Sequence, residues 1–204
     1  MTAQIPDSIA FKGQSFSVVA STDNEIFGLQ RHFRPLEPKM LSTGCYRGYI
    51  ARFSIDASSR FLVKSLTINS PDKCAAINDT PPYCVCDVSK GVNGRSSALT
   101  FDELDLYVPI DGIVRACRGF NQSMYFHGGF QHFTGYGTVM DLIFQNGELV
   151  AAKDLSEEVG RLRQVLCEQA QQEGRELDSA FAWSFCRRTE HSAFAEFRER
   201  HGEF

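Results

Sequence analysis

Alternating apolar and polar positions predict β-strands along much of the first three-quarters of the chain. The clearest run has apolar side chains at every second position, at Tyr49, Ala51, Phe53 and Ile55. A period of two, built from residues that favour strands, predicts a half-buried strand there. Turn-forming residues at 56–59 precede another apolar run at 61–68, so a hairpin is the natural connection. Short apolar runs at 9–11 and 16–20 predict an opening hairpin of the same type.

A second strong hairpin is predicted where Asn146-Gly147 separates the runs 138–144 and 149–153. The Asn-Gly pair favours a type I′ turn, because both central residues of that turn need positive φ. Residues 69–100 lack periodicity and are rich in proline, glycine and small polar residues. That composition predicts an insertion or a long loop.

After residue 153 the period of the apolar positions becomes that of a helix. One helical face carries Leu155, Val159, Leu162 and Leu166. Asp154 followed by Glu157 resembles a capping box at the start of this helix, and Gly174 is suited to its end. A second helical stripe is formed by Leu177, Phe181 and Phe185.

These patterns predict a single α+β domain over residues 1–204. Its β-rich body covers about residues 8–153, as a mostly antiparallel sheet curved into a barrel or a sandwich, because hairpins join antiparallel neighbours. Its helical C-terminal region covers about residues 154–202, with the helices packed on the sheet. A chain of 204 residues is long enough to bury such a core.

Composition and charge exclude several classes of protein. A hydrophobic fraction of 43% and a charged fraction of 23% are ordinary for a folded domain and argue against disorder. A net charge of −4 provides no basic field for nucleic acid. Neither a membrane-spanning apolar run nor a secretory signal pattern is present. With seven cysteines, an odd number, we expect a cytoplasmic protein with free thiols.

The first candidate site lies in the run Ser42-Thr43-Gly44-Cys45-Tyr46-Arg47-Gly48-Tyr49. A nearby cation lowers the pKa of a thiol, so Arg47 could activate Cys45 as a nucleophile. Residues two apart on a strand also share a face, however, and simple strand packing explains the same pair. Local spacing places no histidine base beside Cys45, and nucleophilic catalysis needs one within hydrogen-bond reach. The pattern therefore favours a structural role for Cys45.

A second candidate site consists of Cys74, Cys84 and Cys86. Thiolates bind zinc well, and a Cys-x-Cys spacing brings two of them together. The second ligand pair that structural zinc sites use is missing from the spacing. We therefore expect free thiols in a loop, with neither a metal nor another cofactor.

The segment 119–137 is rich in glycine and aromatic residues and is the main candidate ligand site. The pocket candidates, including one arginine from the earlier motif, are Tyr125, His127, Phe130, His132 and Arg47. Aromatic walls with histidine anchors are typical of a ligand pocket. Histidines five residues apart share neither a helix face nor a strand face, which argues against a shared metal. An aromatic lid over one end of the β-body is the alternative that the pattern favours.

The C-terminal region ends in interleaved charges, with arginines among the glutamates Glu190, Glu196, Glu199 and Glu203. Such interleaving is typical of a solvated, salt-bridged face. Residues 151–204 contain 8 basic and 11 acidic residues, so this quarter carries most of the net negative charge. An acidic surface suits a basic protein partner through electrostatic steering, which makes the four glutamates candidates for partner binding.

Residues 42–56 resemble the signature of a family of uncharacterised bacterial proteins, Ser-Thr-x-Cys-Trp-Arg-Gly-Tyr followed by an alternating strand. Residues 104–112 and 140–150 are similar to two further runs of that family, so the resemblance covers roughly residues 8–158. Tyr46 stands where the family has tryptophan. The resemblance implies a shared fold and assigns no chemistry. The family also accepts aliphatic residues at the cysteine position, which weakens a catalytic role for Cys45.

Three functions follow from these patterns. The favoured one is a non-catalytic cytosolic binding protein, specifically an immunity protein that neutralises a bacterial toxin with a basic domain. An enzyme that uses His127 or His132 with Cys45 or Asp141 is one alternative, and it requires convergent titratable groups in a cleft. A carrier of a small ligand is the other, and it requires an enclosed apolar cavity. Neither nucleic acid nor a membrane is expected as a partner.

Overall fold

The computed structural model describes residues 3–23, 38–70, 76–77, 79–88 and 96–172. Its strands are β1 (Asp7–Phe11), β2 (Gln14–Ser21), β3 (Tyr49–Ile55), β4 (Phe61–Ser70), β5 (Cys84–Val88), β6 (Ser96–Phe101), β7 (Leu106–Tyr107), β8 (Gly112–Phe120), β9 (Tyr136–Gln145) and β10 (Glu148–Asp154). Its helices are the 3₁₀ turns η2 (Gln122–Met124) and η3 (Phe133–Gly135) and the α-helix α1 (Ser156–Gln172).

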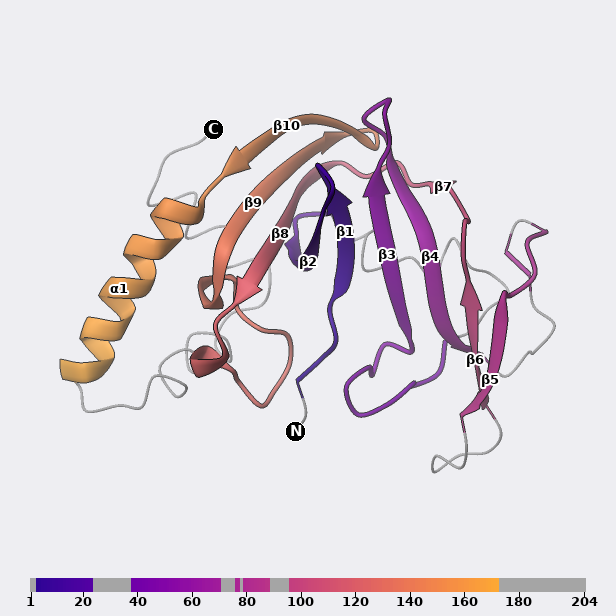
Figure 1. Ribbon diagram of the computed structural model, residues 1–204, viewed down its shortest axis with the longest axis horizontal. Coiled ribbons are helices and arrows are strands. Elements are labelled where there is room, and N and C mark those ends of the chain that lie inside the picture. Colours follow the sequence, from indigo (N-terminus) through magenta and orange to yellow (C-terminus); the bar gives the residue numbers. More distant parts are fainter. Residues whose placement is uncertain (1–2, 24–37, 71–75, 78, 89–95, 173–204) are drawn as a thin grey trace.

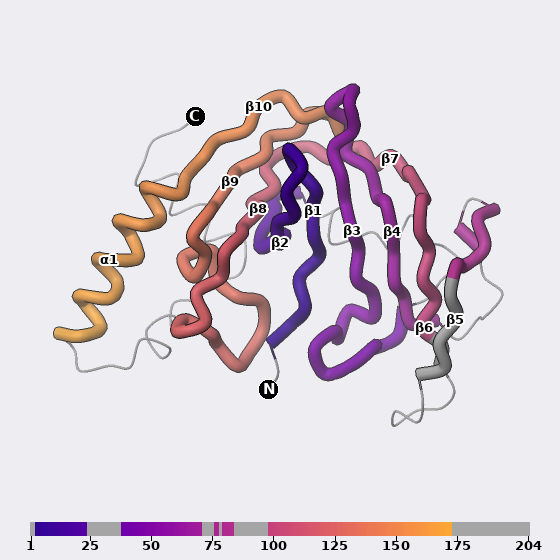
Figure 2. Tube along the Cα trace, in the orientation of Figure 1, coloured from indigo at the N-terminus to yellow at the C-terminus, as the bar shows by residue number. Residues whose placement is uncertain are grey.

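The strands form one curved sheet with the order β10-β9-β8-β2-β1-β3-β4-β6-β5, and β7 pairs with β4 (Figures 1 and 2). Each pairing between neighbours is antiparallel except that of β1 with β3, which is parallel. The α+β class and the mostly antiparallel sheet are therefore confirmed. The sheet is open and does not close into a barrel.

The hairpins predicted from local pattern are present: β1 pairs with β2, β3 with β4, and β9 with β10. Asn146 and Gly147 have φ of 44° and 75°, so the expected turn with two positive φ angles is confirmed. The prediction of a long loop over residues 69–100 is wrong, because β5 and β6 lie within it. β6 pairs with β4, about thirty residues earlier in the chain. Local periodicity does not predict such a pairing, because strand formation here depends on a partner that is distant in sequence.

One face of the sheet buries the larger apolar core. Phe61 of β4 contacts Phe53 of β3 at a ring separation of 4.8 Å and Phe144 of β9 at 5.2 Å. This contact between distant strands is possible because the sheet bends until two hairpin turns meet (Figure 1). There Phe61 N donates to Gly147 O at 2.7 Å, and Leu149 N donates to Ser59 O at 2.7 Å.

Helix α1 covers the other face, over β9 and η3. The apolar cluster beneath it contains Cys117, Phe133, Tyr136, Val139, Leu155 and Val159. Asp154 Oδ1 accepts the Ser156 amide at 2.9 Å, so the predicted cap residue does satisfy a free amide of the first turn. The second predicted helix, from Leu177 onward, lies outside the described residues. The described part of the chain contains no helix long and apolar enough to cross a lipid bilayer.

Candidate functional site

Three segments meet at one end of the sheet, residues 3–5, 38–48 and 121–132, and together we call them the loop end. The N-terminal segment runs between the other two before it enters β1 (Figures 1 and 2). Gln4 N donates to Gly129 O at 2.8 Å on one side, and Ile5 N donates to Gly44 O at 2.8 Å on the other. Segments far apart in sequence are thus joined through main-chain hydrogen bonds.

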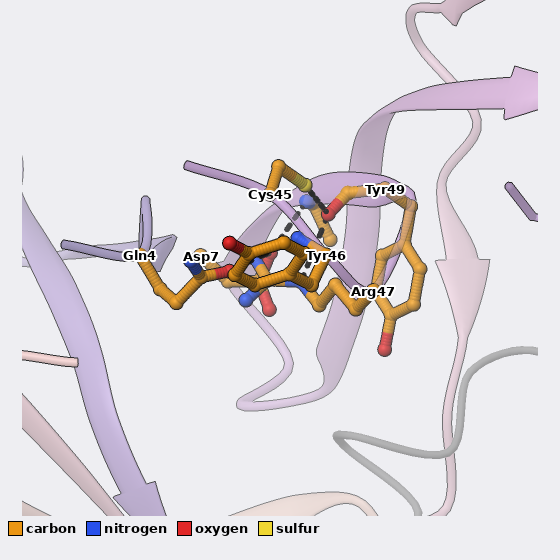
Figure 3. A network of polar contacts seen from close by, with 7 residues as sticks. Gln4, Asp7, Cys45, Tyr46, Arg47 and Tyr49 are labelled. Atoms are coloured by element: carbon orange, nitrogen blue, oxygen red, sulfur yellow. Dashed lines mark hydrogen bonds and ion pairs between the residues drawn. The ribbon is translucent and has the colours of Figure 1, made fainter. Parts of the chain in front are cut away.

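The Gln4 side chain adds a second connection to the 38–48 segment (Figure 3). Its Nε2 donates to Thr43 O at 3.0 Å, and its Oε1 accepts the Tyr46 amide at 3.0 Å. The amide group therefore satisfies a backbone acceptor and a backbone donor within one turn. This pairing holds the backbone of Tyr46 while its side chain faces solvent, 54% exposed.

Arg47 forms the charged centre of the loop end. Its Nη2 donates to Asp7 Oδ1 at 2.6 Å, and its Nε donates to Tyr49 O at 2.8 Å (Figure 3). Its guanidinium also lies over two aromatic rings, 5.2 Å from the Tyr49 centroid and 5.3 Å from the Phe130 centroid. One side chain thus links β1, the start of β3 and the glycine-rich segment.

Asp7 is 1% exposed and uses its two carboxylate oxygens unequally. Oδ1 accepts from Arg47 and also from the Ala51 amide at 2.6 Å. Oδ2 is buried without a hydrogen-bond partner among the described residues. Burial raises the pKa of Asp7 to about 6, outweighing the neighbouring Arg47 and the two hydrogen bonds.

Cys45 is 1% exposed, and its thiol donates to Tyr49 O at 3.2 Å. Burial raises the pKa of this thiol, an effect larger than the opposing one of Arg47. The neighbouring arginine therefore does not activate the thiol, and the thiolate form that a nucleophile needs is disfavoured. Cys45 here fills space and ties its own turn to β3.

The segment around Cys45 is a series of turns and not the strand that the sequence suggested. Cys45 N donates to Ser42 O at 2.9 Å, and β3 begins only at Tyr49. Gly48 makes this path possible with a φ of 82°, and a Cβ there would lie 2.2 Å from Lys39 O. Asn69 anchors the segment from β4 by donating its side-chain amide to Met40 O at 2.7 Å.

Four of the five pocket candidates meet in two pairs, and the fifth, His132, caps a 3₁₀ turn. Arg47 meets Phe130, as above, and Tyr125 contacts His127 with ring centroids 4.8 Å apart. His132 Nδ1 lies 2.8 Å from Thr134 Oγ1 and accepts the Thr134 amide at the start of η3. This arrangement resembles the predicted lid more than a set of groups converging on a ligand.

Asp141, the possible partner of a catalytic histidine, forms a second buried ion pair. Arg115 Nε and Nη2 donate to its two oxygens, each at 2.7 Å, between directly opposed positions of β8 and β9. The Arg115 guanidinium also lies 4.6 Å from the centroid of the Phe133 ring. Asp141 is thereby engaged on both oxygens in the layer beneath α1.

The structure describes only part of the two remaining candidate sites, the cysteine cluster and the C-terminal glutamates. Cys84 and Cys86 lie on β5, where their backbones pair with Thr100 and Ala98 of β6. Cys74 and the four candidate glutamates lie outside the described residues. Within the described part of the chain, no group of three or more histidine, cysteine or acidic side chains is placed to hold a metal ion.

The groups that sequence reasoning missed are Gln4, Asp7 and Asn69. Gln4 and Asp7 lie at the start of the chain, about forty residues before the partners they contact. A polar residue next to a short apolar run is an ordinary strand boundary, so no local signal distinguishes them. For Asp7 one indication exists: it shares a strand face with Ile9 and Phe11, and a buried aspartate on such a face is unusual.

Comparisons of the chain with protein-family models, with curated proteins and with solved structures find no match.

Proposed function

We propose that this chain is a non-catalytic binding protein that engages a protein partner through its loop end. The specific form that we favour is an immunity protein that neutralises a bacterial toxin with a basic domain. The single observation that supports the proposal most is an exposed Tyr46 on a turn whose backbone is held from both sides. Gln4 binds that turn from the N-terminal segment, and Arg47 anchors it to β1.

Rigid exposed aromatic residues are typical anchors of protein interfaces, because little conformational entropy is lost when they bind. Ile5 and Met40 belong to the same loop end, and their side chains are 44% and 52% exposed. Ile5 is joined to Gly44 by its amide, and the Met40 carbonyl accepts from Asn69. The three exposed side chains therefore belong to one connected backbone framework, which suits a protein surface better than a solvated loop.

Most of the groups that an enzyme would need have other tasks in this arrangement, and the remaining one, His127, is exposed with its ring against Tyr125. The Cys45 thiol is buried with a raised pKa, His132 caps η3, and Asp141 is paired with Arg115. A binding function uses these residues as they stand, whereas catalysis would require each of them to be released first.

Charge suits a basic partner. The net charge is −4, and residues 151–204 contribute 11 acidic residues against 8 basic ones. Opposite charges speed association more than they increase affinity, so the acidic C-terminal quarter would steer the partner while Tyr46 anchors it.

The test begins by identifying, among the genes that adjoin this one, a product with a basic toxin-like domain, and that domain is then used as the partner; the absence of any such gene would count against the proposal. Wild-type protein should restore growth to cells that express the toxin domain and should bind the purified domain in calorimetry. Tyr46→Ala should weaken binding at least about 30-fold, as expected for an interface anchor. The matched control is Tyr83→Ala, because Tyr83 is equally aromatic, is 82% exposed and precedes β5 at the sheet edge.

Tyr83→Ala should bind like the wild type. If Tyr46→Ala also does so, the loop end is not the binding surface. If the wild type neither binds the toxin domain nor restores growth, the immunity proposal is wrong.

A further inference from the structure

Asp7 occupies an unusual position, because a buried carboxyl group is the point to which the loop end is attached. Its Oδ1 holds both the Arg47 guanidinium and the Ala51 amide. Arg47 belongs to the 38–48 segment, and its guanidinium contacts Phe130 of the 121–132 segment and the carbonyl of Tyr49 in β3. One carboxyl oxygen therefore supports two of the three loop segments.

The unequal use of the two oxygens fits a carboxyl group that carries a proton. A proton on Oδ2 would remove the buried charge and leave both hydrogen bonds to Oδ1 in place. Oδ2 has no hydrogen-bond partner among the described residues in either form, but in the ionised form it would also carry part of a buried negative charge. Leaving a buried polar atom unpaired is costly, and leaving a charged one unpaired is more so.

Within the part of the chain that the structure describes, the ionisable groups that face Asp7 are Arg47, Cys45 and Tyr49, all from the 38–48 segment and the start of β3. On the other side, Asp7 lies opposite Val18 of β2, which is apolar. Burial raises the pKa of the Cys45 thiol and of the Tyr49 hydroxyl, so both stay neutral through the acidic range. Arginine side chains remain protonated at any pH used here, which leaves Asp7 as the group of this cluster that titrates in the acidic range.

We propose that Asp7 is a proton-linked lock of the loop end: the protonated carboxyl holds the three segments closed, and ionisation makes their opening easier. The lock rests on the contacts of the loop end alone. Its consequence for partner binding rests on the proposed function, since the lock governs the turn that presents Tyr46.

The direction follows from linkage. An Asp7 exposed by opening has an ordinary pKa of 3.8, and the buried Asp7 has a pKa of about 6. The closed state therefore binds the proton more tightly than the open state does, and acidification favours closure. Between pH 7.5 and pH 5 the closed state should gain about tenfold or more over the open state.

The experiment needs no partner and uses the full chain. The side-chain ¹³Cγ resonance of Asp7 and the amide of Ala51, which donates to Asp7, report ionisation directly by nuclear magnetic resonance. Hydrogen exchange of the amides of Gln4, Ile5 and Tyr46 reports opening, since each is bonded across the loop end. Exchange is expressed as protection factors, which removes the intrinsic pH dependence of the chemistry.

We expect the Asp7 resonance to titrate with a midpoint near pH 6, and the three protection factors to rise about tenfold from pH 7.5 to pH 5. Asp7→Asn, which mimics the protonated acid, should show high protection at both pH values. His127→Gln with His132→Asn is the control for histidine titration near the same pH, and it should leave the behaviour unchanged.

A midpoint for Asp7 below pH 4.5 in the wild-type protein would overturn the lock without recourse to any variant. So would protection factors that are independent of pH, or that rise no more in the wild type than in Asp7→Asn. Because no partner is present, these outcomes are distinct from a failure of Tyr46 to bind the toxin domain.

Discussion

Arg47 Nη2 lies 2.6 Å from Oδ1 of Asp7, a residue forty positions earlier in the chain. The contact places a guanidinium between β1 and the glycine-rich segment and buries the carboxylate almost completely. A buried ion pair adds little net stability, but removing one partner leaves the other charge buried and uncompensated. This asymmetry makes the pair a sensitive point for testing the architecture of the loop end.

Arg47→Met should destabilise the protein by about 3 kcal/mol at pH 7.5, because the ionised Asp7 carboxylate loses its counter-charge. The loss should be clearly smaller at pH 5, where Asp7 carries a proton and needs no counter-charge. Urea unfolding at both pH values measures the difference. Equal losses at the two pH values would mean that the Asp7 charge does not determine the effect.

Asp7→Asn should change how stability depends on pH. The pKa of Asp7 is about 6 in the folded state against an ordinary 3.8, so the folded wild type favours the protonated acid. Its contribution to stability is fully present below pH 3.8 and is lost as the pH rises through 6. Relative to Asp7→Asn, the wild type should therefore lose about 2.5 kcal/mol between pH 4 and pH 7.5.

The measurement is the free energy of unfolding of both proteins across that range. Taking the difference between them cancels the titration of groups that they share. A difference that is constant with pH, or that favours the wild type at pH 7.5, would contradict a raised pKa of Asp7.

Asp141→Leu alone should destabilise the protein by about 3–5 kcal/mol, because it leaves the Arg115 guanidinium buried without its carboxylate. The double variant Arg115→Met with Asp141→Leu should recover most of that loss, since buried ion pairs are often replaceable by apolar side chains. A double-mutant cycle from chemical unfolding measures the coupling. Additive effects of the two positions would show that the pair is not coupled in solution.

Gly147→Ala should lower stability by about 2 kcal/mol through two effects. The residue has a φ of 75°, and an added Cβ would lie 2.6 Å from Val108 O. Gly13→Ala is the matched control, since Gly13 has a φ of 73° in a hairpin turn but open space around its Cβ position. Gly13→Ala should cost only about 1 kcal/mol in the same thermal melts. Equal losses would mean that crowding at Gly147 is unimportant.

Local patterns of residues were sufficient to predict the individual strands, turns and helix of this protein. Period-two alternation located the strand around Phe53, the apolar run before Asn146-Gly147 located the strand around Phe144, and the Asn-Gly pair specified the turn type. The change of period after residue 153 located α1, with its buried Val159 and with the buried Leu155 directly before its first residue. These features were predictable because each depends on residues within a few positions of one another, where backbone geometry and side-chain direction are linked.

Which distant groups meet depends on how the whole chain packs. The parallel pairing of β1 with β3, the position of β6 beside β4, and the ion pair between Asp7 and Arg47 all join segments about thirty or forty residues apart. The reactivity of the Cys45 thiol also depends on tertiary packing. Its arginine neighbour was visible in the sequence, but the burial that raises its pKa was not. Burial is a property of how the whole sheet packs, and it outweighs the effect of a single neighbouring charge once both groups are removed from water.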